Sequence, residues 1–328
     1  MNFTDKSYLI TGAAGFIGSH LGNVLVSNNA RVRGIDNYLH PVGAPPRFPV
    51  ERADIREPEF ILSRSKGVDA ILHLAAAINI DAQNVSPELG LDYNVVGTFN
   101  VLEVARKLDL PMVFASSSEV YGSTQERACW CHGGCVDDGA CGCPNQRSID
   151  ERHPLDGQSP YAAFKIAGDR MCHAWKETYG MDINIVRSFN TYGPWQGDDA
   201  YGGVIAKFVS ASLSRKPMTI FGTGEQRRDY LWIDDSVSAY LFALSTRFPG
   251  PVNFGTGTTV SINELAHLIG AETGFTQATH IAPRAGEVHV LRCDWSKAGE
   301  LGWRPTVRFR EGLSRYIEWA RKVRTTST

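Results

Sequence analysis

The sequence has no apolar run long enough to cross a membrane. Its most apolar segment, residues 70–80, is interrupted by His73 and Asn79 and is shorter than the roughly 20 residues that a membrane-spanning helix needs. The N-terminal residues also lack the charged and apolar regions of a signal peptide. We therefore expect a cytoplasmic protein without a membrane partner.

An excess of charge of one sign is absent as well. The 33 basic and 35 acidic residues give a formal net charge of −2, and no run of like charges forms a tail. A nucleic-acid-binding surface requires a marked basic excess, so we expect no nucleic-acid partner. The 328 residues, 43% hydrophobic and 21% charged, are typical of a globular protein with one large or two moderate domains.

Cysteine is scarce outside one segment. Only two of the seven cysteines, Cys172 and Cys293, lie outside residues 129–143. The spacing inside that segment is not the paired C-x-x-C of zinc ribbons, so a structural zinc site and a reduced loop both remain open, and we assign no metal. The thiols and the imidazole in question are Cys129, Cys131, His132, Cys135, Cys141 and Cys143.

The start of the chain carries the most informative motif. An apolar run at residues 8–10 is typical of a strand, and the apolar spacing over residues 16–25 predicts a helix. Between them, Gly12, Gly15 and Gly18 would provide a tight turn, room for a pyrophosphate, and close packing of the helix on the strand. The pyrophosphate would lie at the positive N-terminal end of this helix. The pattern therefore predicts a dinucleotide site.

The next predicted strand, residues 31–36, ends in the acidic side chain of Asp36. A carboxylate at this place accepts hydrogen bonds from the adenosine ribose and repels a 2′-phosphate, so the pattern favours NAD over NADP. The alternative is a glycine-rich loop in another kind of α/β protein, in which Asp36 only caps a turn.

Further strands and helices alternate along the chain. Residues 68–76 are almost continuously apolar, as expected for a strand buried on both faces of a parallel sheet. A helix is predicted over residues 89–108, and the strand after it runs into three hydroxyls at residues 116–118. This alternation predicts a doubly wound parallel sheet, in which ligand-binding residues gather at the carboxyl ends of the strands.

A tyrosine and a lysine four residues apart form the second informative pair. Pro160 is typical of a helix start, so Tyr161 and Lys165 should project from one face of the same helix. An ammonium group beside a phenol lowers the phenol's pKa, which is about 10 when unperturbed, towards the range of a general base. Ser117 could hydrogen-bond the same substrate oxygen. The alternative is an inert surface pair.

With these motifs in place, the chain resembles an extended short-chain dehydrogenase/reductase of the nucleotide-sugar epimerase and dehydratase group. The matching residues run almost from end to end of the sequence. They are residues 11–18, 36–37, 54–55, 73–76, 94, 116–122, 161–165, 187–194, 220–230, 253–257 and 301–303.

The resemblance implies an α/β fold, namely a Rossmann-type doubly wound parallel sheet with a smaller C-terminal α/β substrate-binding domain. The NAD-binding domain would comprise residues 1–186, with a cysteine-rich insertion at about 123–150, and would also receive residues 233–252. Residues 187–232 and 253–328 would bind the nucleotide sugar. NAD would contact Gly12, Gly15, Phe16, Ile17, Gly18, Asp36, Asn37, Asp54, Ile55, Leu74, Ala75, Ala76, Asn94, Ser116, Tyr161 and Lys165.

The same resemblance assigns the substrate site. Ser117 and Tyr161 would hold the sugar's C4 hydroxyl, and the remaining substrate-binding residues would be Asn190, Phe221, Arg228, Arg284 and Glu287. Arginine suits a diphosphate because its fork donates two parallel hydrogen bonds. The alternatives are a salt bridge from Arg228 to Asp229 or Asp234, and a solvated loop position for Glu287.

The implied reaction is NAD-dependent 4-epimerisation of a nucleoside-diphosphate sugar, with a UDP-sugar as the default substrate, by a homodimer. The catalytic residues would be Ser117, Tyr161, Lys165 and Glu119. A 4,6-dehydratase, with a 5,6-dehydratase or uronate decarboxylase behind it, is the alternative, since Glu119 could act as a base although Ser118 occupies the usual acid position. Glu119 could also simply bond a backbone group. A catalytically silent NAD-binding protein is the rival from another class.

Overall fold

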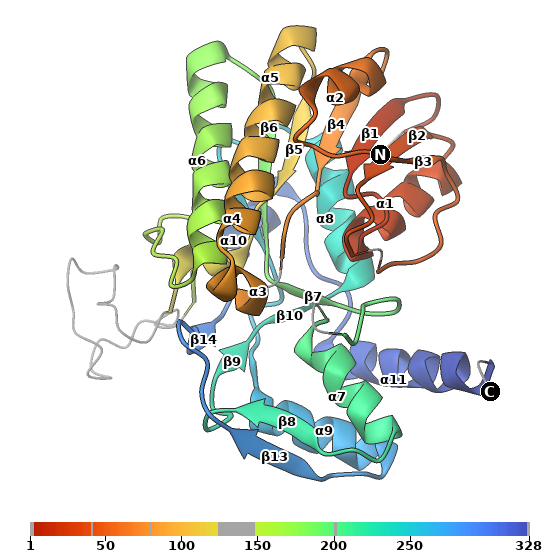
Figure 1. The fold of residues 1–328 in the computed structure, drawn as a ribbon, viewed down its shortest axis with the longest axis vertical. Helices are drawn as coiled ribbons and strands as arrows, with labels where there is room; N and C mark the ends of the chain where they lie inside the picture. Colours follow the sequence, from red (N-terminus) through yellow and green to blue (C-terminus); the bar gives the residue numbers. More distant parts are fainter. Residues whose placement is uncertain (1–2, 41, 79, 124–147, 200–201, 327–328) are drawn as a thin grey trace.

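The computed structural model describes residues 3–40, 42–78, 80–123, 148–199 and 202–326 (Figure 1). Most of the expected insertion therefore falls outside the described residues. This holds for all six potential metal ligands in it, Cys129, Cys131, His132, Cys135, Cys141 and Cys143. The choice between a zinc site and a reduced loop stays open.

Seven parallel strands form the main sheet, in the order β11-β6-β5-β4-β1-β2-β3. This confirms the predicted doubly wound parallel sheet. The strand order reverses beside β1, so the turn after β1 opens at the place where such sheets bind ligands. The strands are β1 (Ser7–Thr11), β2 (Arg31–Asp36), β3 (Val50–Arg52), β4 (Ala70–His73), β5 (Met112–Ala115), β6 (Ile183–Ser188) and β11 (Val252–Phe254).

Helices cover both faces of the sheet, because alternate strand residues are apolar on both sides. In β1, Ile10 packs with Leu21 and Leu25 of α1 (Phe16–Ser27), whereas Leu9 packs with Leu102 of α5 (Thr98–Leu108). Beside α1 on the first face lies α8 (Ile233–Ser245), and α2 (Pro58–Ser65) and α6 (Pro160–Tyr179) flank α5 on the second. The helix expected over residues 89–108 continues from α4 (Glu88–Gly90) through the π-helical turn η1 (Leu91–Gly97) into α5.

The smaller C-terminal region lies beyond one end of the sheet (Figure 1). It contains a parallel pair, β8 and β13, a three-stranded sheet in the order β12-β9-β14, and the pair β10-β7. Its elements are β7 (Asn190–Tyr192), α7 (Val204–Leu213), β8 (Met218–Phe221), β9 (Arg227–Arg228), β10 (Tyr230–Trp232), β12 (Val260–Ser261), α9 (Ile262–Thr273), β13 (Ala278–Ile281), β14 (Val290–Leu291) and α11 (Phe309–Thr326). Helix α10 (Ser296–Leu301) packs against β11 of the main sheet.

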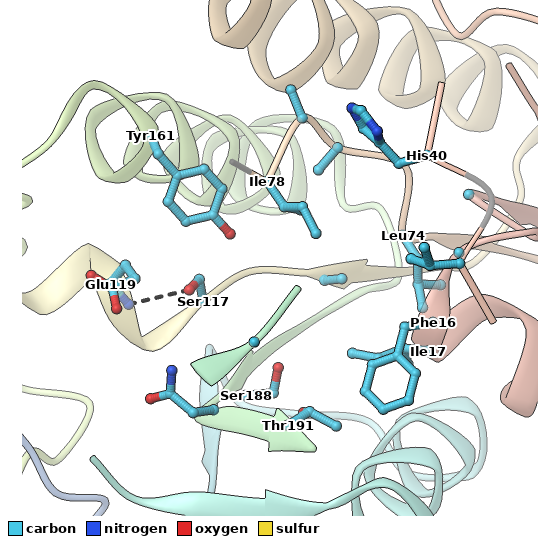
Figure 2. A pocket seen from close by; sticks show the side chains of 18 of the residues that line it. Phe16, Ile17, His40, Leu74, Ile78, Ser117, Glu119, Tyr161, Ser188 and Thr191 are labelled. Atoms are coloured by element: carbon cyan, nitrogen blue, oxygen red, sulfur yellow. Dashed lines mark hydrogen bonds between the residues drawn. The ribbon is translucent and has the colours of Figure 1, made fainter. Parts of the chain in front are cut away.

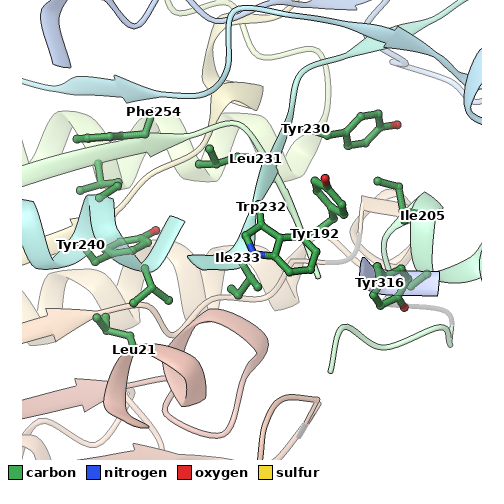
Figure 3. Packing of buried hydrophobic residues seen from close by; sticks show 14 of the residues in the cluster. Leu21, Tyr192, Ile205, Tyr230, Leu231, Trp232, Ile233, Tyr240, Phe254 and Tyr316 are labelled. Atoms are coloured by element: carbon green, nitrogen blue, oxygen red, sulfur yellow. The ribbon is translucent and has the colours of Figure 1, made fainter. Parts of the chain in front are cut away.

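One apolar cluster joins the two regions. Figure 3 shows it running from Leu21 and Tyr240, beside the main sheet, to Trp232, Tyr192 and Tyr316 of the smaller region. The strands also pass the expected boundaries, since β11 pairs residues 252–254 with residues 186–188 of β6. Strands β6 and β11 thus each continue two residues past the expected domain boundaries at residues 186 and 252, because the hydrogen-bonded ladder between them continues there.

The remaining short helices are α3 (Ile80–Val85) and the 3₁₀ turn η2 (Ser118–Tyr121). Among the described residues, no helix is both long and apolar enough to cross a membrane.

Candidate active site

A cavity of about 520 Å³ lies between the carboxyl ends of the sheet strands and the smaller region. The glycine turn after β1 lines one part of it, and Phe221, Arg228 and Arg284 line another. The cavity therefore brings the residues predicted for the cofactor and those predicted for the substrate into one space.

The glycine turn has the close backbone packing that its sequence predicts. Gly12 has a φ of +71°, and a Cβ at this position would lie 2.7 Å from the backbone nitrogen of Ala75. A Cβ at Gly18 would lie 2.1 Å from the carbonyl oxygen of Gly12. Helix α1 starts at Phe16 without a side-chain cap, so its first N–H groups are available to an anion in the cavity.

Asp36 lies at the end of β2 and lines the same cavity. Its carboxylate accepts the N–H groups of Ala14 and Tyr38 at 2.9 and 2.8 Å, one on each oxygen. A carboxylate has about four acceptor positions, so Asp36 can also accept a ribose hydroxyl. Burial raises the pKa of Asp36, and these backbone hydrogen bonds oppose that shift. The uncapped helix and the acid together fit NAD.

The structure separates the other predicted cofactor residues into two groups. Those that line the cavity are Gly12, Gly15, Phe16, Ile17, Gly18, Asn37, Ile55, Leu74, Ala75, Ala76, Ser116, Tyr161 and Lys165. Asp54 and Asn94 do not. The carboxylate of Asp54 pairs with Arg56 at 2.9 Å. The amide of Asn94 bonds both backbone groups of Ala77, at 2.8 and 2.9 Å, and so holds the cavity wall from behind.

The predicted catalytic residues converge from two elements. Ser117 ends the β5 segment and caps η2, where its Oγ accepts the N–H of Glu119 at 3.2 Å. Tyr161 and Lys165 come from α6, which starts at Pro160 as expected and is capped by Ser159. Figure 2 shows the hydroxyls of Tyr161 and Ser117 pointing toward the same space.

Lys165 reaches from α6 to the end of β5. Its Nζ donates to the carbonyl oxygen of Ala115 at 2.5 Å. Burial lowers the pKa of Lys165 to about 8. Burial also raises the pKa of the Tyr161 phenol, although the hydrogen bond with Ser117 lowers it. The loss of hydration outweighs the hydrogen bond with Ser117, so the net shift of the Tyr161 pKa is upward.

Glu119 presents its carboxylate to the cavity. The backbone N–H of this residue bonds Ser117, but among the described residues its carboxylate has no hydrogen-bond partner. Burial raises the pKa of Glu119, the charge of Arg228 opposes the shift, and Glu287 adds to it. The carboxylate is therefore available to a bound molecule, which does not fit the alternative of a backbone bond.

The substrate end of the cavity combines an aromatic ring with two arginines. Arg284 stacks over the ring of Phe221, and Arg228 lies 4.0 Å from Glu287, which Gln226 also contacts at 3.2 Å. The Oδ1 atom of Asn190 is buried without a partner in the described part of the chain. All five predicted substrate residues line the cavity.

The salt bridge considered for Arg228 forms with Glu287 and not with Asp229 or Asp234. Asp229 accepts the backbone N–H groups of Thr256, Gly257 and Cys293. Asp234 accepts the indole N–H of Trp232.

Several cavity residues escaped the sequence analysis. The start of α7 contributes Gly203, Val204 and Lys207, and the wall near Tyr161 includes Ile78 and Tyr240. The Gly202-Gly203 pair directly before the apolar residues of α7 was a usable signal, because glycines allow a ligand to approach a helix N-terminus. Ile78 and Tyr240 carry no local signal.

Comparison with known proteins gives a consistent result. Residues 8–255 match the model of the NAD dependent epimerase/dehydratase family. A putative UDP-glucose 4-epimerase of Methanocaldococcus jannaschii is 36% identical over 317 residues, which cover 95% of this chain and 97% of that protein.

Two solved structures have the same fold. The UDP-glucose 4-epimerase of Thermotoga maritima with UDP-glucose superposes with a TM-score of 0.87, at 28% identity, covering 97% of this chain and 99% of that one. The UDP-glucose 4-epimerase of Thermus thermophilus in complex with NAD gives a TM-score of 0.84 at 27% identity, covering 96% and 99%.

Proposed function

Because the chain belongs to the NAD-dependent epimerase/dehydratase family, we propose that it is a 4-epimerase of nucleoside-diphosphate sugars, with UDP-sugars as substrates. The observation that carries this proposal is the shared cavity. Its walls hold the glycine turn and Asp36, then Ser117, Tyr161 and Lys165, and finally the two arginines with Phe221. This order of residues supports a dinucleotide at one end of the cavity, a nucleotide at the other, and the sugar between them beside Tyr161.

When bound, NAD supplies a reversible two-electron oxidation at a sugar carbon. The first N–H groups of α1 would hold its pyrophosphate, and Asp36 its adenosine ribose. Leu74, Ala75 and Ala76 form the adjoining wall after β4.

Tyr161 is the residue placed to exchange the proton. Its hydroxyl and that of Ser117 face the same space, so both can bond one sugar hydroxyl. As C4 is oxidised, Tyr161 takes the proton of that hydroxyl, and it returns the proton when C4 is reduced. The ammonium group of Lys165 would stabilise the phenolate form of Tyr161 when NAD is bound. Between the two steps the 4-keto sugar must rotate so that its other face meets the cofactor. The small side chains of Ala76 and Ala77 line the cavity there.

The other end of the cavity accounts for the nucleotide. Arg228 and Arg284 carry guanidinium forks that match the oxygens of a diphosphate. Phe221, which carries Arg284 on its ring, offers an apolar surface to a pyrimidine base.

A 4,6-dehydratase is the second candidate, and Glu119 is the observation in its favour. An unpaired carboxylate beside the sugar position can remove a proton from C5 after oxidation at C4. The expected acid position holds Ser118, which is buried and cannot protonate a leaving hydroxyl as a carboxylic acid does. This difference makes epimerisation the first proposal.

A panel of UDP-sugars incubated with the protein in deuterated water separates the two reactions. Epimerisation gives a product of unchanged mass, without solvent deuterium and with inverted C4 in the NMR spectrum. Loss of water with deuterium at carbon would establish a dehydratase. Loss of carbon dioxide from a uronic-acid sugar would establish a decarboxylase.

A homodimer is part of the proposal. Val96, Phe99 and Tyr179 expose 44%, 44% and 53% of their surface on η1, α5 and α6, and Trp175 bridges the two aromatic rings at 6.0 and 5.8 Å. Large exposed apolar side chains on neighbouring helices favour association. Sedimentation should show a dimer that Phe99→Glu dissociates.

We also propose a cytoplasmic location, where the free thiols of Cys172 and Cys293 would stay reduced.

A further inference from the structure

A fully buried ion pair lies behind the catalytic residues and has no part in the mechanism above. Asp169 of α6 and Arg187 of β6 expose 1% and 2% of their side chains. Two parallel hydrogen bonds join them, from Nε to Oδ2 at 2.8 Å and from NH2 to Oδ1 at 2.7 Å. Neither residue lines the cavity.

Two hydrogen bonds connect α6 to the end of β5, and Asp169 accepts one of them. Ser116 donates its hydroxyl to Oδ2 of Asp169 at 2.7 Å. One helical turn earlier, Lys165 donates to the carbonyl of Ala115. The next residue along the strand is Ser117, and one further turn back along the helix is Tyr161. The last residue of β5 and the residue after it are thus tied to two consecutive turns of α6, directly beside the hydroxyls of Ser117 and Tyr161.

Arg187 extends the connection to the element that carries Glu119. Its NH1 donates to the hydroxyl of Tyr121 at 2.7 Å, and that hydroxyl donates to Oδ1 of Asn253 at 2.7 Å. Tyr121 belongs to η2, two residues after Glu119. The guanidinium of Arg187, which lies on β6, therefore connects to α6 through Asp169 and to η2 through Tyr121. The hydroxyl of Tyr121 extends the connection to β11.

We propose that Asp169 and Arg187 are positioning residues that set the separation of Tyr161 and Ser117 and hold the Lys165 ammonium in place. The inference rests on the proposed function, since it assigns these residues a role in that reaction. A buried ion pair contributes little net stability, because its desolvation offsets its attraction. Its contribution here is geometric, since a misplacement of about 1 Å at a reacting group can cost about 100-fold in rate.

Asp169 also supplies a charge to Lys165. The groups around that ammonium are His73 from β4, the Ala115 carbonyl from β5, and Cys172 and Asp169 from α6. Of these, Asp169 is the carboxylate that raises the pKa of Lys165, against the larger effect of burial. Removing its charge should therefore leave Lys165 protonated only at lower pH.

The test replaces the pair by neutral, hydrogen-bonding side chains, Asp169→Asn with Arg187→Gln, so that no unpaired charge stays buried. The matched control is Asp235→Asn. Asp235 is another buried acid and binds the backbone of Thr306 and Val307, away from the cavity. We expect the double variant to keep its NAD and its KM for the nucleotide sugar, while kcat falls about 10- to 100-fold.

The alkaline limb of the kcat–pH profile should also move to lower pH in the double variant. The control should keep the wild-type kcat and profile even if it melts earlier. Ser116→Ala, which leaves the ion pair intact, should lower kcat by less and keeps the test informative if the double variant does not fold. A kcat and a pH profile in the double variant equal to those of the control would overturn the proposal.

Amide hydrogen exchange provides a readout that does not depend on activity. Exchange at residues 115–119 and 160–166 should rise together in the double variant, and should not change there in Asp235→Asn. Unchanged exchange at both segments would also overturn the proposal. A wild-type protein inactive on every nucleotide sugar would instead contradict the proposed function, and the exchange result would still decide whether the pair holds the two segments.

Discussion

The guanidinium carbon of Arg284 lies 3.8 Å from the centroid of the Phe221 ring. Both side chains line the cavity, so the stacking holds the cation at the cavity wall. A stacked, partly desolvated guanidinium of this kind is stabilised by about 0.5–2 kcal/mol. The two residues should therefore act together in binding the nucleotide.

Replacing Phe221 by leucine should weaken the binding of UDP about 3- to 30-fold, since the ring and its cation–π contact are lost. Arg284→Lys keeps the charge but loses the planar fork, and should give a similar loss. Calorimetric titration with UDP measures both. Arg227→Lys is the matched control, because Arg227 contacts Thr259 and Glu264 outside the cavity. Equal affinity in all four proteins would contradict the assignment of this end to the nucleotide.

Tyr161→Phe should lower kcat by about 100- to 10,000-fold, the usual contribution of a general acid–base group. The ring stays, so the variant should retain bound NAD, which release by heat and chromatography will quantify. Tyr240→Phe removes a buried hydroxyl from the same cavity and provides a comparison. A Tyr161→Phe protein that keeps its biological role would support the silent NAD-binding alternative.

Glu119→Gln distinguishes the two candidate reactions. In an epimerase the change removes a negative charge beside the sugar but no transferred proton, so turnover should persist within about 10-fold. In a dehydratase it removes the C5 base, and turnover should fall by about 100-fold or more. The variant and the wild-type protein are compared on the same substrate panel, with product mass as the readout.

Lys165→Met should stabilise the protein while abolishing turnover. The folded-state pKa of Lys165, about 8, lies below its ordinary value of 10.5 because of burial. Folding therefore works against the protonated amine, and this cost, about 3 kcal/mol at most at pH 7, disappears as pH rises from 8 to 10.5. The lost hydrogen bond to Ala115 offsets about 1 kcal/mol of the gain.

Denaturant unfolding at several pH values measures this effect. The difference in stability between Lys165→Met and the wild-type protein should be largest near pH 7 and shrink above pH 8. Lys322→Met, an exposed change on α11, should alter stability by less than about 0.5 kcal/mol at any pH. A variant less stable than the wild-type protein at pH 7 would show that the hydrogen bond outweighs the burial of the charge.

Local backbone requirements made much of the dinucleotide site predictable. Gly12 needs a positive φ and has a backbone against its Cβ position, and only glycine meets both conditions. Asp36 sits at a strand end that periodicity identifies. Asp54 and Asn94 were also expected at the cofactor, and nothing local could reveal that their side chains bond Arg56 and the backbone of Ala77.

The sequence by itself determined the strand–turn–helix at the N-terminus, the start of α6 at Pro160 and the shared helix face of Tyr161 and Lys165, because these depend on neighbours within about one helical turn. Only the tertiary structure decided what those side chains meet. The burial that raises the pKa of Tyr161 and the approach of Glu119 to Arg228 bring together segments far apart in the chain, and the Asp169–Arg187 pair depends on how α6 packs on the sheet. These contacts and the desolvation of the groups form only when the helices pack on the sheet and the smaller region covers its carboxyl edge.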